Sequence, residues 1–338
     1  MKISNNEITV GLLLGGASPE RPISKYSAEG VLKALRSLGY RVRLIDPAYG
    51  KNQPQTEAEY FSDCDCFPIS STNYIDAVNS KLFNDVDIVF NALHGNWGED
   101  GKIQSLLEFK KIPYTGSGIL ASAISMDKHI TKTILRHSGV TTADWLLLEK
   151  NKYLFDEVYQ KVKRNFIFPL VVKPNDQGSA IGLSICRNSD ELEEGIYSAF
   201  QFSKKILIEQ YIDGYEATVG IIDNLPLPVL EIKPKHEYYD YECKYTKGMS
   251  EYEVPAKFPE ETYKLLQNQA LLAYNSVGCK NYGRIDFRLD KNYSPFCLEI
   301  NTLPGLTGTS LLPKAAQAVN ISFEELIDRI IKNSLNEL

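Results

Sequence analysis

The sequence predicts an α/β fold in which an N-terminal parallel sheet is followed by a part that is α+β. Over residues 1–116, apolar strand segments alternate with segments of helical spacing, as in parallel βαβ units. From Tyr215 onward, strand segments follow one another through short turns, which favours antiparallel pairing. Residues 283–301 alternate in polarity on both sides of a turn-rich cluster, which is typical of a β-hairpin.

Length, charge and cysteine content limit the class of protein. A chain of 338 residues suits two or three domains, and its net charge of −6 disfavours nucleic acid as a partner. No apolar run approaches the roughly 20 residues that span a bilayer, and the N-terminus lacks the apolar core of a signal peptide. The six cysteines are scattered, so free thiols are expected. We therefore expect a cytoplasmic protein that binds neither membrane nor nucleic acid.

The N-terminal segment is predicted to begin with a strand, a helix over Ser24–Leu38 that ends at Gly39, and a second strand. A third strand ends at His94. In open α/β sheets, ligands bind at the carboxyl ends of the strands. Two polar, glycine-containing segments follow strands here, at 15–21 and 94–101.

The middle of the chain is predicted to contain one long helix over 119–139 and then two strands joined by a glycine-rich loop, 175–182. Lys173 closes the first of these strands, and a lysine beside loop N–H groups suits a phosphate. An ordinary hairpin with an exposed lysine is the alternative, since the loop matches neither common nucleotide-binding glycine motif. Further on, segment 235–255 holds five tyrosines without a clear period, and we expect it to be a lid.

The hairpin at 283–301 is the most informative stretch. If Asp290 opposes Pro295 across a four-residue loop, Asp286 lies opposite Glu299 and Arg284 opposite Asn301. Two facing carboxylates repel, and with a carboxamide oxygen they form a set that suits Mg²⁺. Alternatively, the face is solvated and Arg288 neutralises the pair. The hairpin alone supports both interpretations equally, and the small-residue loop that follows it favours the metal.

The chain as a whole resembles the D-alanine–D-alanine ligases of the ATP-grasp superfamily. The matching motifs occur in order between about Val10 and Pro313: LLLGGASPERPIS, ALHGNWGEDG, IPYTGSGILASAISMDK, VVKPNDQGSAIGL, YDYECKY, GRIDFRLD and LEINTLPGLTGTSLLP. The resemblance implies a three-domain ATP-grasp fold with an N-terminal domain (1–116), a central subdomain (117–210) and a C-terminal subdomain (211–338). It also implies an enzyme that uses ATP to join two D-alanine molecules through an acyl phosphate, for peptidoglycan precursor synthesis.

The resemblance also implies roles for individual residues on the nucleotide side. It assigns ATP contacts to Lys128, Lys173, Glu209, Ile212 (through its backbone), Glu216 and Lys244. A second set, which agrees with the hairpin analysis, would bind Mg²⁺ or Mn²⁺, two ions in the family: Asp286, Glu299 and Asn301.

On the amino-acid side, the resemblance implies that Glu20 pairs with the ammonium of the first D-alanine, with His94 nearby. Glu20 would connect through Ser179 to Tyr245 on the lid. Three further positions complete the implied set. Arg284 and the N–H of Gly305 would hold the oxyanion, and Ser310 with the N–H of Leu311 would receive the carboxylate of the second substrate. A homodimer is also implied.

Some positions depart from the family pattern. Ala180 replaces a second serine found in many members, Pro22 interrupts the usual run after Glu20, and Thr309 stands where some members have histidine. The pair Lys244–Tyr245 is the pattern associated with D-alanine as the second substrate. Alternatives are a related ligase that uses D-serine or D-lactate, and a nucleotide-binding pseudoenzyme. An ATP-grasp carboxylase or unrelated peptide ligase is disfavoured because it would not need Glu20, Ser179 and Tyr245 together.

Overall fold

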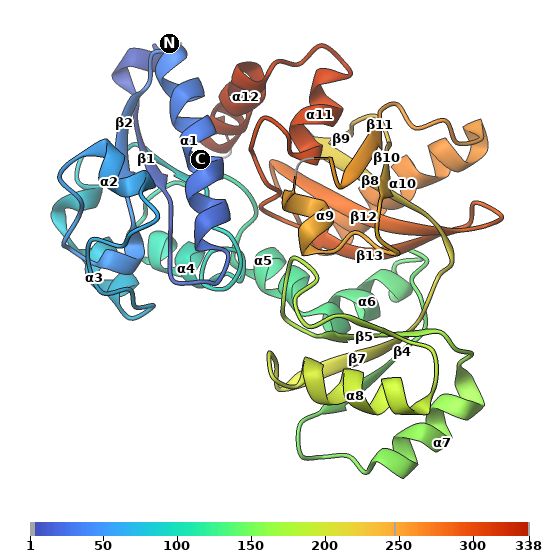
Figure 1. Cartoon of the computed structure of the whole chain (residues 1–338). Coiled ribbons are helices and arrows are strands. Elements are labelled where there is room, and N and C mark those ends of the chain that lie inside the picture. The colour runs from blue at the N-terminus through green and yellow to red at the C-terminus, as the bar shows by residue number, and fades with distance from the viewer. Residues whose placement is uncertain (1–3, 247, 337–338) are drawn as a thin grey trace.

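The computed structural model describes residues 4–246 and 248–336, and three sheets organise this part of the chain (Figure 1). The first sheet has the order β2-β1-β3, the second β4-β7-β5-β6, and the third β11-β10-β8-β12-β13 with β9 paired to β8. The strands span β1 Thr9–Leu13, β2 Arg41–Ile45, β3 Ile88–Asn91, β4 Trp145–Glu149, β5 Leu170–Pro174, β6 Ser184–Cys186, β7 Lys205–Gln210, β8 Gly214–Ile222, β9 Leu225–Pro226, β10 Leu230–Pro234, β11 Ser250–Glu253, β12 Tyr282–Asp290 and β13 Pro295–Asn301.

Helices cover these sheets. The α-helices span α1 Arg21–Ser37, α2 Glu57–Phe61, α3 Asn73–Asn79, α4 Lys102–Phe109, α5 Ile119–Met126, α6 Lys128–His137, α7 Phe155–Asn165, α8 Ser189–Ala199, α9 Tyr241–Tyr245, α10 Glu260–Ser276, α11 Leu311–Gln317 and α12 Phe323–Asn336. Three short 3₁₀ helices lie at η1 Asn5–Glu7, η2 Pro47–Tyr49 and η3 Lys81–Phe83.

The α/β fold class is confirmed. The first sheet is parallel and lies within 1–116, whereas the other two are antiparallel and lie within 117–210 and 211–338. The division into three domains at those boundaries stays a prediction. Helix α1 begins at Arg21, three residues earlier than predicted, and includes Pro22 in its first turn. Proline is tolerated there because a first-turn N–H has no partner within the helix.

The prediction of one long helix over 119–139 is wrong. The chain forms α5 and α6, which are separated at Asp127, whose backbone is extended. The Asp127 side chain accepts a hydrogen bond from Ile130 N at 2.9 Å and so caps α6. Helical periodicity continues through this sequence, but the cap starts a new helix. As a result, Lys128 occupies the first turn of α6, where its N–H donates to Asn175 O at 3.0 Å.

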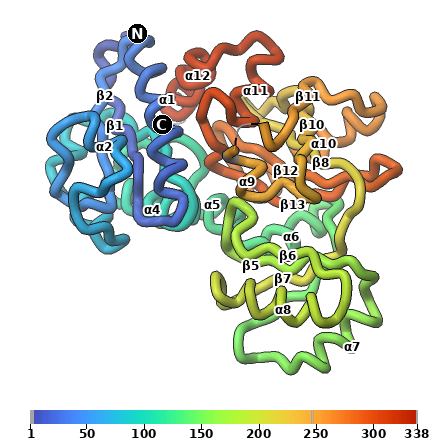
Figure 2. Tube along the Cα trace, viewed as in Figure 1, coloured from blue at the N-terminus to red at the C-terminus, as the bar shows by residue number. Residues whose placement is uncertain are grey.

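The C-terminal helix α12 packs against α1. In Figures 1 and 2 it lies beside α1, although the two helices are at opposite ends of the chain. Ile327 and Ile331 of α12 share one hydrophobic core with Val31 and Leu35 of α1. Tyr40 also donates to Asp328 at 2.7 Å. The last helix therefore joins α1, beside the first sheet, to Ile222 and Tyr282 of the third sheet in one core.

The predicted hairpin register is confirmed where it matters for the carboxylates. Asp286 lies opposite Glu299, and Arg284 lies opposite Asn301. The turn end of the prediction is wrong, because Leu289 rather than Asp290 opposes Pro295. The register shifts by one residue through a β-bulge that leaves Leu298 as the extra residue.

Segment 235–255 has more regular structure than predicted. It contains α9 and β11, and β11 pairs with β10 to form the edge of the third sheet. The segment is thus anchored at its second half, and its role as a lid stays a prediction.

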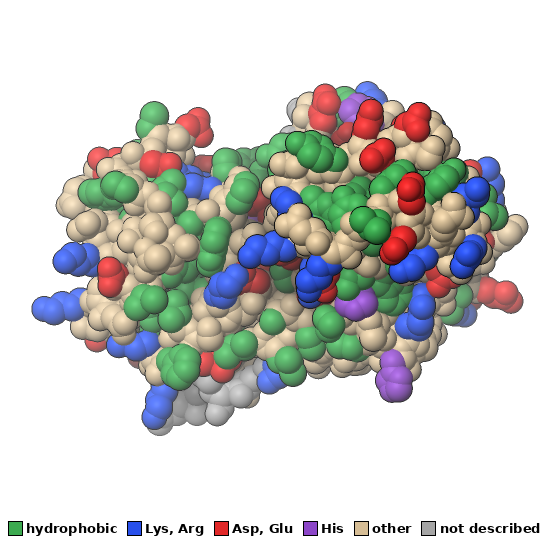
Figure 3. Space-filling view, turned by 90° about the horizontal axis from the view of Figure 1, so that it is seen from below, with side chains coloured by type: hydrophobic (Ala, Val, Ile, Leu, Met, Phe, Trp, Pro, Cys, Tyr) green, Lys and Arg blue, Asp and Glu red, His purple; other side chains and the backbone are tan. Residues whose placement is uncertain are grey.

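The side chains on the surface and the state of the cysteines match what the amino-acid composition predicts. On the face shown in Figure 3, acidic, basic and hydrophobic side chains interleave. All six cysteines are free. Within residues 4–246 and 248–336, no helix is both long and apolar enough to cross a bilayer.

Candidate active site

A deep cleft lies between the second and third sheets. It encloses about 960 Å³ when the open solvent at its mouth is included. Its polar lining contains the following residues predicted to bind nucleotide or metal: Lys128, Lys173, Glu209, Ile212, Glu216, Lys244, Asp286 and Glu299. The structure thus brings together residues from five strands and two helices that are far apart in the sequence. Apolar side chains, among them Leu298 from the bulge, provide the remaining walls.

Two buried lysines pair with two glutamates in this cleft, of which Glu209 is buried and Glu299 is partly buried. Lys128 Nζ lies 3.2 Å from Glu299 Oε2, and Lys173 Nζ lies 3.0 Å from Glu209 Oε2. Burial opposes ionisation of Glu299, but Lys128, Lys244 and Lys173 lower its pKa to about 2. Burial opposes ionisation of Glu209 as well, and neighbouring ammonium groups again lower its pKa. Both carboxylates are therefore charged, and each lysine has a partner that an anionic ligand could replace.

Arg288 pairs with Glu216, and not with the Asp286–Glu299 pair as in the alternative to a metal site. Its Nη1 lies 3.3 Å from Glu216 Oε2, and its Nε donates to Ile212 O at 3.1 Å. The alternative in which Arg288 neutralises Asp286 and Glu299 is therefore wrong. Burial raises the pKa of Glu216, although Arg288 acts in the opposite direction. Arg288 thus connects Glu216 and Ile212, two residues that the resemblance assigns to the nucleotide.

The three predicted metal ligands lie together on β12 and β13. Arg284 Nε and Nη2 each donate to Asp286 at 2.8 Å, Asn301 Nδ2 donates to it at 3.0 Å, and Thr218 Oγ1 donates at 2.6 Å. Glu299 lies opposite Asp286 and is held by Lys128. Two carboxylates and one amide oxygen fit a hard divalent cation, so this donor set is suitable for Mg²⁺ or Mn²⁺.

Glu20 reaches across from the N-terminal domain to the glycine-rich loop of the central region. The Ser179 hydroxyl donates a hydrogen bond to Glu20 Oε1. The approach is close on both sides: a Cβ at Gly95 would lie 2.5 Å from Glu20 Oε2, and one at Gly178 would lie 3.3 Å away. Gly95 also has a φ of 70°, which favours glycine. Burial and then the nearby charge of Glu99 raise the pKa of Glu20.

His94 lies beside Glu20 but has partners for both ring nitrogens. Nε2 lies 3.1 Å from Ser27 Oγ, and Nδ1 lies 3.1 Å from Glu99 Oε1. The ring is nine-tenths buried. These contacts fix its orientation at the carboxyl end of the first sheet, near the position predicted for the first amino acid.

The loop after β13 holds the residues predicted to contact the second substrate. Ser310 precedes α11 and accepts a hydrogen bond from Thr307 N at 3.1 Å. A Cβ at Gly305 would lie 3.0 Å from Ser310 Oγ, so the two ends of the loop are close. Leu311 begins α11, and its side chain is buried against Leu230 and Ile232. Among the described residues, these three do not belong to the lining of the nucleotide cleft.

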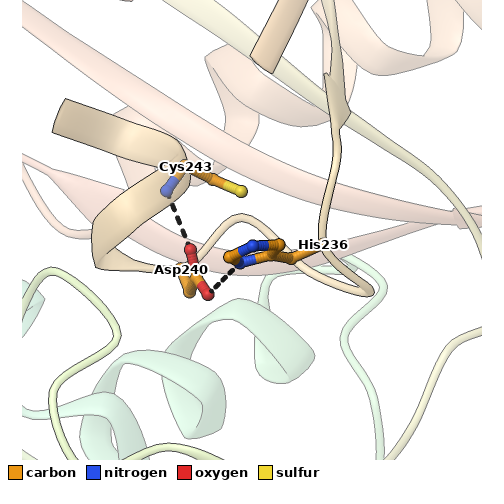
Figure 4. A group of neighbouring side chains, drawn as sticks. All are labelled: His236, Asp240 and Cys243. Atoms are coloured by element: carbon orange, nitrogen blue, oxygen red, sulfur yellow. Dashed lines mark hydrogen bonds and ion pairs between the residues drawn. The ribbon is translucent and has the colours of Figure 1, made fainter. Parts of the chain in front are cut away.

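The short helix α9 places the lid residues at the cleft. Lys244 lines the cleft with its Nζ 5.3 Å from the centre of the Tyr239 ring, whereas the side chain of Tyr245 lies outside the described part of the structure. Figure 4 shows how the helix begins. Asp240 accepts from Cys243 N at 2.8 Å and pairs with His236 Nδ1 at 2.7 Å. A helix cap and an ion pair between residues 236 and 243 thus order the segment that is predicted to be a lid.

Sequence analysis missed two charged residues of this region, Arg288 as the partner of Glu216 and Lys132 behind Glu209. Lys132 lies 3.3 Å from Glu209 and is fully buried. A signal was present, because Lys132 follows Lys128 by four residues on an amphipathic helix and therefore lies on the same face.

Comparisons with known proteins agree with this geometry. Residues 9–117 match the family model described as "D-ala D-ala ligase N-terminus", and residues 134–332 match "D-ala D-ala ligase C-terminus". The chain is 40% identical over 323 residues to the D-alanine–D-alanine ligase of Syntrophotalea carbinolica, covering 95% of this chain and 94% of the relative.

Solved structures extend the similarity to three dimensions. The crystal structure of D-alanine–D-alanine ligase from Bacillus anthracis has a TM-score of 0.79 at 35% identity, and the alignment covers 98% of both chains. Its complex with ATP has a TM-score of 0.77 at 33% identity, also with 98% of both chains covered. Two family models matched in order, together with relatives similar over nearly the whole length, show that the chain belongs to the D-alanine–D-alanine ligase family.

Proposed function

We propose that this protein is an ATP-dependent ligase that joins two D-alanine molecules into D-alanyl-D-alanine, for peptidoglycan precursor synthesis. The observation that carries the proposal is the cleft between the two antiparallel sheets. It is lined by three lysines and by carboxylates that hold two of them. Such a site suits a polyphosphate, because the lysines can exchange a carboxylate partner for phosphate oxygens.

The nucleotide would lie in this cleft with its phosphates at Lys128 and Lys173. Glu209 and the backbone of Ile212 would contact the base, and Glu216 would accept hydrogen bonds from the ribose hydroxyls. Asp286, Glu299 and Asn301 would hold Mg²⁺ or Mn²⁺, two ions if the site follows the family. When bound, the metal would supply positive charge to the phosphates during transfer.

The amino-acid substrates would bind between the N-terminal domain and the loop after β13. Glu20 would hold the ammonium of the first D-alanine, whose carboxylate attacks the γ-phosphate to give an acyl phosphate and ADP. The amine of the second D-alanine would then attack the acyl carbon, with phosphate leaving. Arg284 and the N–H of Gly305 would stabilise the oxyanion that forms in this attack, and Ser310 with the N–H of Leu311 would hold the second carboxylate.

We expect the reaction to take place in the cytoplasm. Six free cysteines are compatible with a reducing compartment, so the enzyme would act in the cytoplasm. A homodimer is the assembly that the family resemblance implies.

An assay of D-alanine-dependent ADP formation tests the proposal. The purified chain would be given ATP and Mg²⁺ with D-alanine, D-serine or D-lactate singly and in competition at neutral pH. We expect ADP release that requires D-alanine and a product that is mainly D-alanyl-D-alanine. A preference for D-lactate or D-serine as the second substrate would overturn the assigned acceptor. If no ADP is released with any of these substrates, the protein would instead be a nucleotide-binding protein without turnover.

A further inference from the structure

Lys132 is a fully buried lysine directly behind the nucleotide cleft. It projects from α6, and its Nζ donates to Thr142 Oγ1 at 2.8 Å and lies 3.3 Å from Glu209 Oε1. Unlike Lys128 on the preceding turn, it does not contribute to the described lining of the cleft. Burying an ammonium group costs free energy unless its partners compensate. Its position therefore requires an explanation that the proposed nucleotide contacts do not supply.

Glu209 lies between two lysines. Lys173 contacts Oε2 at 3.0 Å from the cleft side, and Lys132 approaches Oε1 at 3.3 Å from the interior. Oε1 is buried and has no hydrogen-bond partner among the described residues. The carboxylate is therefore electrostatically held on both sides but keeps acceptor capacity on the oxygen that Lys132 faces.

The two lysines cannot have the same role once a nucleotide binds. Lys173 lines the cleft and would move to the phosphates, which removes its charge from Glu209. Without a second cation, Glu209 would then be an unpaired buried carboxylate, which is strongly unfavourable. Lys132 has no route to the ligand and would remain beside Glu209.

We propose that Lys132 is a positioning residue for nucleotide binding, which keeps Glu209 charged and oriented from behind and so releases Lys173 for the phosphates. This inference rests on the proposed binding of ATP in the cleft. It goes further by separating the roles of the three lysines of α6 and β5.

The surroundings of Lys132 connect the two sheets that form the cleft. Thr142, its hydroxyl partner, donates onward to Cys297 O at 2.8 Å, on the strand that also carries Glu299. Glu209 is on the second sheet, at the register position of Trp145, and the Trp145 ring centre lies 5.3 Å from Lys132 Nζ. The Lys132 ammonium group therefore contacts Glu209 of the second sheet directly and is linked to β13 of the third sheet through Thr142. Through these contacts it can influence how Glu209 is placed relative to the metal ligands.

The test is a set of binding measurements with ADP at fixed magnesium concentration on the full-length protein. We expect K132M to raise the Kd for ADP about tenfold. Losses of this size follow when a residue that supports a ligand-binding side chain, without touching the ligand itself, is removed. K132R should retain affinity closer to that of the wild type, because it keeps the positive charge. The effect should act through Glu209, so K132M in an E209Q background should change the Kd much less than it does alone.

A pH series separates positioning from general stability. Burial lowers the pKa of Lys132 to about 8, even though Glu209 raises it. The other groups that face it are Lys173 from β5 and the thiol of Cys297 from β13, whose pKa burial raises, so that the thiol stays protonated. We expect the Kd of the wild type to rise between about pH 7 and pH 9 and that of K132M to be high and flat. K132R should also be flat, but at the lower Kd.

Matched controls define the outcomes. Lys25 is a buried lysine of the N-terminal domain that donates to Ser62 O at 2.7 Å, so K25M tests the general effect of losing such a group. A rise in Kd with K25M equal to that with K132M would overturn the inference, as would K132M binding ADP like the wild type. If K132R does not fold, the comparison of pH profiles between the wild type and K132M decides. Failure of the wild type itself to bind ADP would refute the proposed function instead.

Discussion

Ser179 of the glycine-rich loop donates a hydrogen bond to Glu20 of the N-terminal domain. This contact joins residues 159 positions apart. It holds the glycine-rich loop of the central region against the segment between β1 and α1. Because burial and the charge of Glu99 raise the pKa of Glu20, the carboxylate is held at a cost to folding. Glu20 is unfavourable for stability and yet central to the predicted substrate site, which indicates a trade-off between stability and activity.

We expect Glu20→Gln to lower kcat/KM for D-alanine about ten- to hundredfold, since a charged partner for the substrate ammonium is lost. The Kd for ADP should not change. Steady-state kinetics with varied D-alanine measure the effect, and Glu29→Gln, at a partly exposed position on α1, is the control. Equal kcat/KM values for Glu20→Gln and the wild type would contradict the role of Glu20.

The same substitution should stabilise the folded protein at neutral pH. The pKa of Glu20 is raised on folding, so the cost of this carboxyl group to folding grows as the pH rises above the pKa of the unfolded chain and is complete above the raised pKa. Below the pKa of the unfolded chain both states are protonated, and this penalty disappears. We therefore expect Glu20→Gln to have a higher Tm than the wild type near pH 7 and a much smaller difference near pH 4. A lower Tm at pH 7 would show that the Ser179 contact outweighs the burial penalty.

Glu299 offers a test of the metal site. Lys128 and the other nearby ammonium groups lower the pKa of Glu299 to about 2, so the carboxylate is ionised at neutral pH. Glu299→Gln removes that charge and leaves the Lys128 ammonium without its partner. We expect D-alanine-dependent ADP formation to fall by about a hundredfold or more, with circular dichroism unchanged.

A magnesium titration sharpens this result. If Glu299 contributes to a cation site, the concentration of Mg²⁺ needed for half-maximal residual activity should rise in Glu299→Gln. Glu251→Gln on the exposed edge strand β11 should behave as the wild type. Unchanged activity in Glu299→Gln would contradict the metal assignment.

The parts that could be predicted from the sequence are those set by local periodicity. The two-residue period of strands and an assumed four-residue turn placed Asp286 opposite Glu299, although the turn itself is shorter than assumed. The bulge at Leu298 was not predictable in this way, because one extra residue in the strand offsets one fewer in the turn and leaves the carboxylates in register. Period alone also could not reveal that Asp127 starts a new helix.

The remaining features depend on tertiary packing, which periodicity does not contain. An amphipathic C-terminal helix was predicted, but its docking on α1 results from long-range contacts such as that of Tyr40 with Asp328. Lys132 is the clearest case, since a lysine on a helix is normally exposed and its burial depends on Glu209 arriving from a strand 77 residues later. Functional residues that support a binding side chain without lining the cleft themselves are therefore the hardest to find in a single sequence.

The lid should lose order when Asp240 is changed. Asp240→Ala removes both the cap of α9 and the ion pair with His236, whereas Asp240→Asn keeps a good capping residue and loses only the charge. We expect amide exchange over 236–246 to quicken in both, and more in Asp240→Ala. The KM for ATP should rise in the same order, since Lys244 belongs to this helix.

Protonation of His236 should contribute to the order of the lid. The hydrogen bond with Asp240 raises the pKa of His236, so its contribution is complete below the pKa of the unfolded chain and is lost as the pH rises through the folded one. Protection factors over 236–246 should therefore decrease between about pH 6 and pH 8. His236→Gln should abolish this pH dependence, and a dependence that persists in the variant would show that another group is responsible.

Leu298 gives a final prediction, about the apolar side of the nucleotide site. The bulge places Leu298 next to Glu299 with both side chains lining the cleft. Leu298→Ala removes apolar surface that a base would cover, which costs about 1 to 2 kcal/mol of binding. We expect the KM for ATP to rise about tenfold with kcat unchanged at saturating ATP, because the contact would be equally strong before and during phosphoryl transfer. Leu265→Ala, at an exposed position of α10, is the control. A fall in kcat with an unchanged KM would mean that Leu298 supports the geometry of Glu299 rather than the base.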